Sequence, residues 1–233
     1  EAARRHVHPR KTRRLANPIF QRLVFLSLLL RQPGVLPRPV DLALPRFARA
    51  HFAHDLTVQR RRSGRLPCRG QDDRDKEDAP GLVKAREWGL ETLFLNPKHF
   101  ASREEYDRAV IRELEQLQID LVCLAGYMKV LTPELCDAFK HRIVNIHPAL
   151  LPSFPGLHVQ QKAIDWGVRF SGCTVHFVAA EVDMGPIILQ AVVPVLQDDT
   201  EETLAARILV EEHRIYPEAV RLYFEGRIEV RGR

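Results

Sequence analysis

The chain has 233 residues and a formal net charge of +5, and this length is sufficient for one α/β domain with a sizeable core. Its four cysteines have no CxxC spacing and no accompanying histidine pattern, which excludes a metal site of that kind and suits a reducing, cytoplasmic compartment. The best candidate for a membrane span, Val24 to Leu30, is far too short, so no membrane partner is expected.

Charge and proline are distributed unevenly along the chain. Residues 1–80 carry 18 Lys+Arg against 8 Asp+Glu, whereas residues 81–233 carry 17 against 22. A basic arm is compatible with nucleic acid, a membrane surface or a targeting peptide. Residues 1–75, however, hold 16 arginines and scattered prolines, with no capped helix and no convincing alternating strand. We interpret them as the product of a shifted reading frame or a wrongly assigned start, with a transit peptide as the second interpretation, and expect no nucleic-acid partner.

Helices and strands alternate from residue 76 onward. A helix is predicted from Leu82 to Gly89 and a short strand from Glu91 to Leu95. Ser102-Arg103-Glu104-Glu105 has the form of a capping box, which opens a helix with apolar residues at helical spacing. Residues 119–125 are almost continuously apolar, the pattern of a central parallel strand. Thr132-Pro133 then begins another helix.

The next strand carries two polar side chains at its end. The β-branched residues between 143 and 146 predict a buried strand, which stops at Pro148 because proline has no N–H for a ladder. Asn145 and His147 therefore lie at the strand end and on the same face. Ligands of open α/β sheets bind beyond the carboxyl ends of the strands, so this position indicates a site.

The remaining segments complete an α/β pattern. A strand at residues 173–178 leads to a polar loop with Glu181 and Asp183, and a strand at 187–195 is expected to pair back onto it. Two helices, from Asp199 to about His213 and from Pro217 to Phe224, and a short strand at residues 227–230 are predicted after it. The alternation favours a doubly wound, mostly parallel, Rossmann-like sheet.

Asn145, His147 and Asp183 together fit acyl transfer without a covalent enzyme intermediate. An amide N–H of Asn145 can donate to an oxyanion, and Asp183 can orient His147 and stabilise its imidazolium form. A single histidine at a strand end is more often a hydrogen-bonded structural residue, so this interpretation depends on the residues around it.

Two longer strings resemble the signature segments of the folate-dependent formyltransferases. They are NIHPALLPSFPGLH at residues 145–158 and GCTVHFVAAEVDMGPII at residues 172–188. The proline after His147 and EHRIYP at residues 212–217 favour the members that formylate glycinamide ribonucleotide. Formyltetrahydrofolate deformylase is an alternative within the family, although a second histidine after the catalytic one is expected there.

This resemblance implies a reaction and its small-molecule partners. The formyl group of 10-formyltetrahydrofolate would pass to the amine of glycinamide ribonucleotide, in purine biosynthesis, with no metal. Asn145 and His147 would hold and polarise the formyl group, and Asp183 would orient His147. Glu212, with His213 as its neighbour, would bind the ribonucleotide. Further contacts to folate are implied for Arg103, Met128, Lys129, Val130, Leu131, Asn145, Ala179, Ala180, Glu181, Val182 and Asp183. The family resemblance leaves a monomer or a homodimer open.

The resemblance covers residues 76–233 and leaves residues 1–75 unmatched. Members of the family begin with a buried strand and a loop that opens a helix and grips the substrate phosphate. We therefore expect a formyltransferase domain at 76–233 that lacks this strand and loop, after a poorly ordered segment at 1–75. Weak or no activity is expected for such a chain, and a non-catalytic or folate-only binding remnant is the alternative function.

Overall fold

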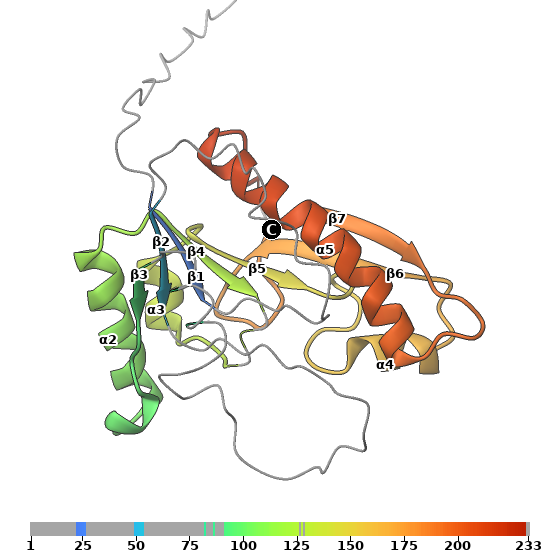
Figure 1. The fold of residues 1–233 in the computed structure, drawn as a ribbon, viewed down its shortest axis with the longest axis horizontal. Coiled ribbons are helices and arrows are strands. Elements are labelled where there is room, and N and C mark those ends of the chain that lie inside the picture. Colours follow the sequence, from blue (N-terminus) through green and yellow to red (C-terminus); the bar gives the residue numbers. More distant parts are fainter. Residues whose placement is uncertain are drawn as a thin grey trace, which may run out of the picture.

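The structure is a computed structural model that describes residues 22–26, 49–53, 82, 86, 91–125, 127 and 129–231. Its centre is a seven-stranded sheet in the order β3-β2-β1-β4-β5-β6-β7 (Figure 1). The strands are β1 (Arg22–Leu26), β2 (Arg49–Ala53), β3 (Glu91–Leu93), β4 (Leu121–Ala125), β5 (Ile143–His147), β6 (Phe170–Phe177) and β7 (Ile187–Pro194). The strands from β1 to β5 run parallel, whereas β6 and β7 are antiparallel to their neighbours. This order confirms the predicted doubly wound, mostly parallel sheet.

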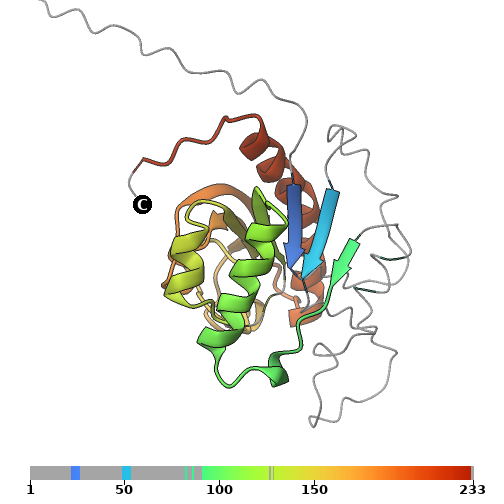
Figure 2. The ribbon, with the colours of Figure 1, turned by 90° about the vertical axis from the view of Figure 1, so that its left-hand side faces the viewer.

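Helices cover both faces of this sheet. They are the short 3-10 helix η2 (Pro97–His99), α2 (Arg103–Gln116), α3 (Pro133–Ala138), α4 (Val159–Asp165) and α5 (Glu201–Phe224). Figure 2 shows α2 and α3 on one side of the strands and the long helix α5 on the other. The predicted N-caps are present, because Ser102 accepts from the N–H of Glu105 and Thr132 from that of Leu135. The capping box at Ser102 is only half formed, since the carboxylate of Glu105 accepts from the N–H of Ala101. None of the helices in the described ranges is both long and apolar enough to cross a membrane.

β4 supplies both hydrophobic cores. Val122 and Leu124 belong to the cluster under α2 and α3, whereas Leu121 and Cys123 belong to the cluster under α5. A strand buried on both faces needs apolar residues at every position, which explains why residues 119–125 are almost continuously apolar. The first residues of β5 alternate between the same two cores. Ile143 packs under α2 and α3, and Val144 packs under α5.

β1 and β2 correct the expectation that residues 1–75 contribute no strand. Leu23–Leu26 pair in parallel with Leu121–Leu124 of β4, and β2 pairs in parallel with β1. The sheet therefore has a strand in the position that we predicted to be empty. A central parallel strand shows a short continuous apolar run and no alternation, and Leu-Val-Phe-Leu at residues 23–26 is such a run. We also predicted that the chain lacks a phosphate loop and that residues 1–75 are poorly ordered. Apart from β1 and β2, these residues lie outside the described part of the chain.

The C-terminal helix is one element where two were predicted. α5 continues from Glu201 to Phe224 with Pro217 inside it, although proline removes a helical N–H and normally kinks or ends a helix. Burial on both sides of the proline holds the helix on the sheet, and the hydroxyl of Tyr216 donates to the carbonyl of Leu124 at 2.7 Å. Residues 227–230, which the structure describes, lie outside any strand, so the predicted final strand is wrong.

Candidate active site

Asn145 and His147 occupy the carboxyl end of β5, as predicted. Their side chains alternate with Val144 and Ile146, which pack under α5, so they lie on the opposite face of the sheet. The partners of His147 on this face come from two loops, at Phe154 and Asp183. His147 is buried, with 5% of its surface exposed, whereas Asn145 is partly exposed. The histidine is thus held by protein groups, while the amide is open to a ligand.

Both ring nitrogens of His147 face oxygen atoms. Nε2 lies 2.9 Å from the carbonyl oxygen of Phe154, and Nδ1 lies 3.4 Å from Oδ2 of Asp183. A carbonyl can only accept, so Nε2 carries the proton in this contact. A proton on Nδ1 as well would complete the pairing with the carboxylate. His147 thus has an acceptor at each ring nitrogen, and Asp183 is placed to orient the imidazole.

The order of the strands alone does not explain why Asp183 lies beside His147. β6 runs antiparallel to β5, so its last residue, Phe177, lies opposite Val144 and away from His147. The following loop turns back over the face that carries His147. The turn is tight at Gly185, where an added Cβ would stand 1.8 Å from the carbonyl oxygen of Phe177. Asp183 itself has a positive φ of 58°, a conformation that aspartate adopts more readily than most residues.

The carboxylate of Asp183 joins two loops to the strands. Its Oδ2 accepts from the N–H of Gly156 at 2.9 Å, and its side chain is only 9% exposed. The loop after His147 and the loop after β6 are therefore fixed to each other at the catalytic pair. A carboxylate with these partners is held in one position, which is what an orienting group for an imidazole requires.

His176 is a second histidine within the site. It lies opposite Asn145 in the β5–β6 register, and its Nε2 is 3.3 Å from Nδ2 of Asn145 and 3.7 Å from Oδ1 of Asp183. Its Nδ1 donates to the carbonyl of Phe177 at 2.9 Å, which leaves Nε2 as an acceptor for the Asn145 amide. Burial lowers the pKa of His176, which favours this neutral form. The antiparallel pairing of β5 and β6 thus places His176 where it can orient the amide of Asn145.

The expected folate contacts before β5 lie on α2 and on the connection after β4. Arg103 is exposed at the first position of α2, and Val130 is 47% exposed. Leu131 is buried, and the ammonium group of Lys129 lies 5.6 Å from the ring centroid of Tyr106. Met128 lies outside the described residues.

The expected contacts after β6 lie on the loop that carries Asp183. Ala179 is partly buried, whereas Ala180, Glu181 and Val182 are exposed. These four residues precede Asp183 directly, so a ligand beside Asn145 would meet this loop. The structure contains no ligand contacts, and the folate roles of these residues remain predictions.

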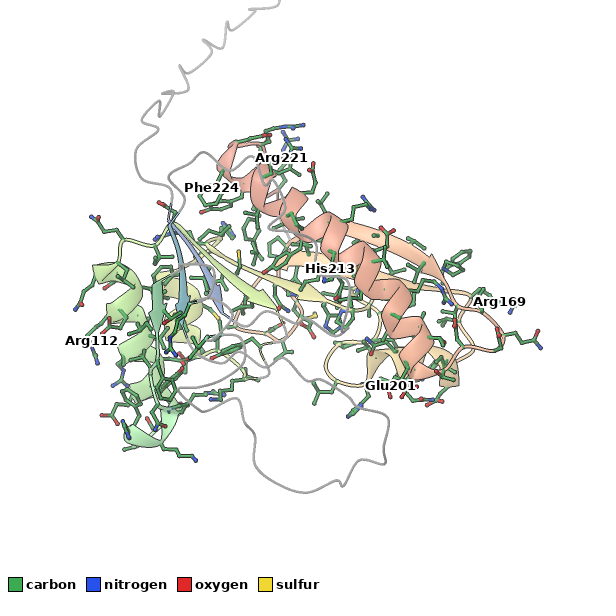
Figure 3. The ribbon with its side chains drawn as sticks, viewed as in Figure 1. Arg112, Arg169, Glu201, His213, Arg221 and Phe224 are labelled. Carbon is green, nitrogen blue, oxygen red and sulfur yellow. The ribbon has the colours of Figure 1, made fainter. Side chains whose placement is uncertain are left out.

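Glu212 and His213 lie on α5, which packs on the face of the sheet opposite to Asn145 and His147. Figure 3 shows His213 midway along this helix. Partial desolvation lowers the pKa of His213 although the residue is exposed, and the charge of Glu212 contributes to the raised pKa of the Cys173 thiol. The structure thus places this pair apart from the catalytic residues, and its role in binding the ribonucleotide remains a prediction.

Burial suppresses the thiolate form of the three cysteines that the structure describes. Burial raises the pKa of Cys136 to about 11 and of Cys173 to about 12, and it raises the pKa of the fully buried Cys123 as well. The ranges that the structure describes hold no group of three His, Cys, Asp or Glu side chains arranged to bind a metal ion.

The lowered pKa of His176 predicts a pH-dependent stability. Below the ordinary histidine pKa of 6.5, the unfolded chain binds a proton at this position that the folded protein resists, so the stability contributed above that pH is lost as the pH falls. The melting temperature should fall between about pH 7.5 and about pH 5, and less steeply in His176→Gln. His158→Gln is the control, because that side chain is 78% exposed. Equal slopes in His176→Gln and the unaltered protein would contradict the assignment.

Comparisons with known proteins agree with this geometry. Residues 74–220 match the family model described as Formyl transferase. The chain is 44% identical over 156 residues to phosphoribosylglycinamide formyltransferase of Escherichia coli (strain K12), covering 67% of this chain and 74% of that protein. It is 47% identical over 152 residues to the trifunctional purine biosynthetic protein adenosine-3 of Drosophila melanogaster, covering 65% of this chain but 11% of that protein.

The structural likeness extends over more of the chain than the sequence likeness. Glycinamide ribonucleotide transformylase 1 from Symbiobacterium toebii superposes with a TM-score of 0.74 and 42% identity, covering 93% of this chain and 92% of that one. Phosphoribosylglycinamide formyltransferase from Brucella melitensis has a TM-score of 0.67 at 38% identity, covering 91% and 99% of the two chains. From the family match over residues 74–220 and these relatives, the chain belongs to the formyl transferase family.

Proposed function

We propose that this chain transfers the formyl group of 10-formyltetrahydrofolate to the amine of glycinamide ribonucleotide. The observation that carries the proposal is the placement of Asn145, His147 and Asp183 around one strand end in a member of the formyl transferase family. The names of the relatives, phosphoribosylglycinamide formyltransferase among them, supply the acceptor. We further propose a cytoplasmic enzyme that acts as a monomer or a homodimer on these two small molecules.

The arrangement suits direct transfer between the two substrates. The amine attacks the formyl carbon, a C–N bond forms, and the formyl oxygen takes up negative charge. The partly exposed amide of Asn145 and the imidazolium of His147 stabilise that charge. The bond from carbon to N10 of the folate then breaks, N10 receives a proton, and the attacking amine loses one. The nucleophile belongs to the substrate, so neither a serine nor a cysteine nucleophile is required.

His147 must change one partner in this mechanism. In the structure the N–H at Nε2 is directed to the carbonyl of Phe154, at 2.9 Å. The oxyanion replaces that carbonyl as the acceptor when the substrates bind, while Asp183 stays at Nδ1. Asn145 keeps its contact with His176 through one amide hydrogen and has a second for the oxyanion. Each donor thereby serves one protein group and the reacting oxygen.

The presence of β1 removes one of the two reasons for predicting weak activity of this chain. That prediction rested on a missing strand and a missing phosphate loop. The first reason is removed, because Leu26 of β1 pairs with Leu124 and brings the end of β1 beside the end of β4. The second depends on residues after Leu26, which lie outside the described residues and have no Gly-rich turn before Gly34. A weakened site should therefore raise KM for the ribonucleotide and leave KM for folate unchanged.

A substrate-resolved assay tests the proposed function. Formyl transfer to glycinamide ribonucleotide is measured together with calorimetric titrations of a folate analogue and of the ribonucleotide. Binding of both compounds and formylation of the amine support the proposal. Binding of the folate analogue alone, without turnover, identifies a non-catalytic remnant, and release of formate without the ribonucleotide identifies a deformylase.

His147→Ala should reduce kcat on the order of 10²-fold to 10⁴-fold, the usual contribution of a general acid–base group. The residue lies at the end of β5, so the far-ultraviolet circular dichroism spectrum should stay unchanged. His158→Ala is the matched control, because its side chain is 78% exposed and points to Glu201 at 4.0 Å. Wild-type kcat in His147→Ala, measured with saturating substrates, would show that the site is wrongly assigned.

Asp183→Asn keeps the shape of the side chain but removes the charge that pairs with His147. We expect kcat to fall at least about 10²-fold, because an orienting carboxylate also stabilises the imidazolium form. The dissociation constant of a folate analogue should change little, since the loop and its contact with Gly156 can persist. A fall in folate affinity with unchanged kcat would assign Asp183 to binding instead.

A further inference from the structure

The loop that follows His147 leaves the sheet abruptly. β5 pairs with β6 as far as His147 opposite Thr174, and Pro148 then ends the ladder. The backbone groups of the next residues therefore need partners elsewhere. Two side chains supply them, Thr174 on β6 and Gln190 on β7, which lie opposite each other in the β6–β7 register.

These two side chains bind the backbone of Ala149 and Leu151. The hydroxyl of Thr174 donates to the carbonyl of Ala149 at 2.7 Å and accepts from the N–H of Leu151 at 3.0 Å. Nε2 of Gln190 donates to the same hydroxyl oxygen at 2.9 Å and to the carbonyl of Leu151 at 3.0 Å. We call this set of four hydrogen bonds the Thr174–Gln190 clamp.

The hydroxyl of Thr174 and the amide nitrogen of Gln190 use their full hydrogen-bonding capacity in the clamp. A hydroxyl has one proton and two lone pairs, and Thr174 uses all three. The amide nitrogen of Gln190 has two protons, and both have an acceptor. Thr174 is fully buried, whereas Gln190 is an exposed residue on the edge strand. Gln190 therefore contributes little to the core. Because both of its amide protons bind inward, its side chain is placed to hold the loop.

The clamp lies three residues before the catalytic contacts of the same loop. Ser153 closes a turn onto the carbonyl of Leu150 at 2.9 Å, and Phe154 then presents its carbonyl to His147. Gly156 follows and donates to Asp183. The backbone after residue 151 thus runs directly from the clamp to both members of the catalytic pair.

Close packing fixes the other side of the loop. Gly172 lies opposite Val192 on β7, and a Cβ at Gly172 would stand 2.8 Å from the Cδ2 atom of Leu150. The loop therefore sits directly on the β6–β7 hairpin, with Leu150 over the glycine and Leu151 in the clamp. The backbone of residues 149–151 is thus fixed on both sides, which sets where the rest of the loop begins.

We propose that Gln190 is a positioning residue for formyl transfer, acting with Thr174 through the loop backbone on His147 and Asp183. The inference rests on the proposed function, because it concerns the same catalytic pair. Gln190 touches neither His147 nor Asp183, and its influence passes through Leu151, Phe154 and Gly156. Misplacement of a reacting group by about 1 Å can lower a rate by about 10²-fold, so loosening the loop should reduce kcat.

The test compares variants of the full chain that differ only in the clamp. Gln190→Glu keeps the shape but replaces both donors with acceptors, and Gln190→Met removes polarity. Both should lower kcat between about 10-fold and about 100-fold with KM for folate unchanged. Thr174→Val should lower kcat in the same way. Thr174→Ser keeps the hydroxyl, so its kcat should stay close to that of the unaltered protein. Val192→Thr is the control, because Val192 is 59% exposed on the same face of β7.

Amide hydrogen exchange separates positioning from a general loss of stability. The N–H groups of Leu151 and Gly156 should exchange faster in both Gln190 variants, while the melting temperature stays close to that of the Val192→Thr control. Unchanged kcat in the Gln190 variants, or a loss of kcat that follows a general fall in melting temperature, overturns the inference. If the unaltered chain transfers no formyl group, the proposed function fails, whereas the exchange rates still decide whether the clamp holds the loop.

Discussion

The carboxylate of Asp183 is the interaction on which the site depends. Its two oxygens meet His147, His176 and the N–H of Gly156, which come from two strands and a loop. His176 only lies near it, because its Nε2 accepts from Asn145. The N–H groups of His147 and Gly156 are therefore the donors that this buried carboxylate requires. The loop after β6 has to cross back over the sheet to bring it there, and Gly185 permits that crossing because a side chain would strike the carbonyl of Phe177.

The two histidines beside Asp183 have different environments and therefore different roles. His176 is buried with its Nδ1 proton on the Phe177 carbonyl, so it remains neutral and accepts from Asn145. His147 faces an oxygen at each nitrogen, so it is placed to donate hydrogen bonds. The neighbours of the two imidazoles thus give them different hydrogen-bonding roles.

The sheet explains why loops, and not helices, complete the site. α2 and α3 cover the part of one face near β4, and α5 covers the other face. The antiparallel hairpin of β6 and β7 extends the sheet beyond β5 without adding a crossover helix on the face of Asn145. The proline-rich loop after His147 and the loop of Asp183 fill that space. Side chains of the hairpin, Thr174 and Gln190, replace the ladder that Pro148 interrupts.

The sequence alone determined the features that local chemistry specifies. The apolar run of β4 and the end of β5 at Pro148 follow from residues adjacent in the chain, as do the helix starts at Ser102 and Thr132. The signature strings likewise singled out Asn145, His147 and Asp183.

Tertiary structure decided the features that depend on distant partners. β1 is a strand because β4 and β2 pair with it, and α5 continues through Pro217 because the sheet buries both of its flanks. The antiparallel register set His176 opposite Asn145 and Thr174 opposite Gln190. A strand with a polar side chain has the same sequence pattern whether that side chain faces solvent or a catalytic group. Only the packing of the neighbouring strand and loop distinguishes these two environments.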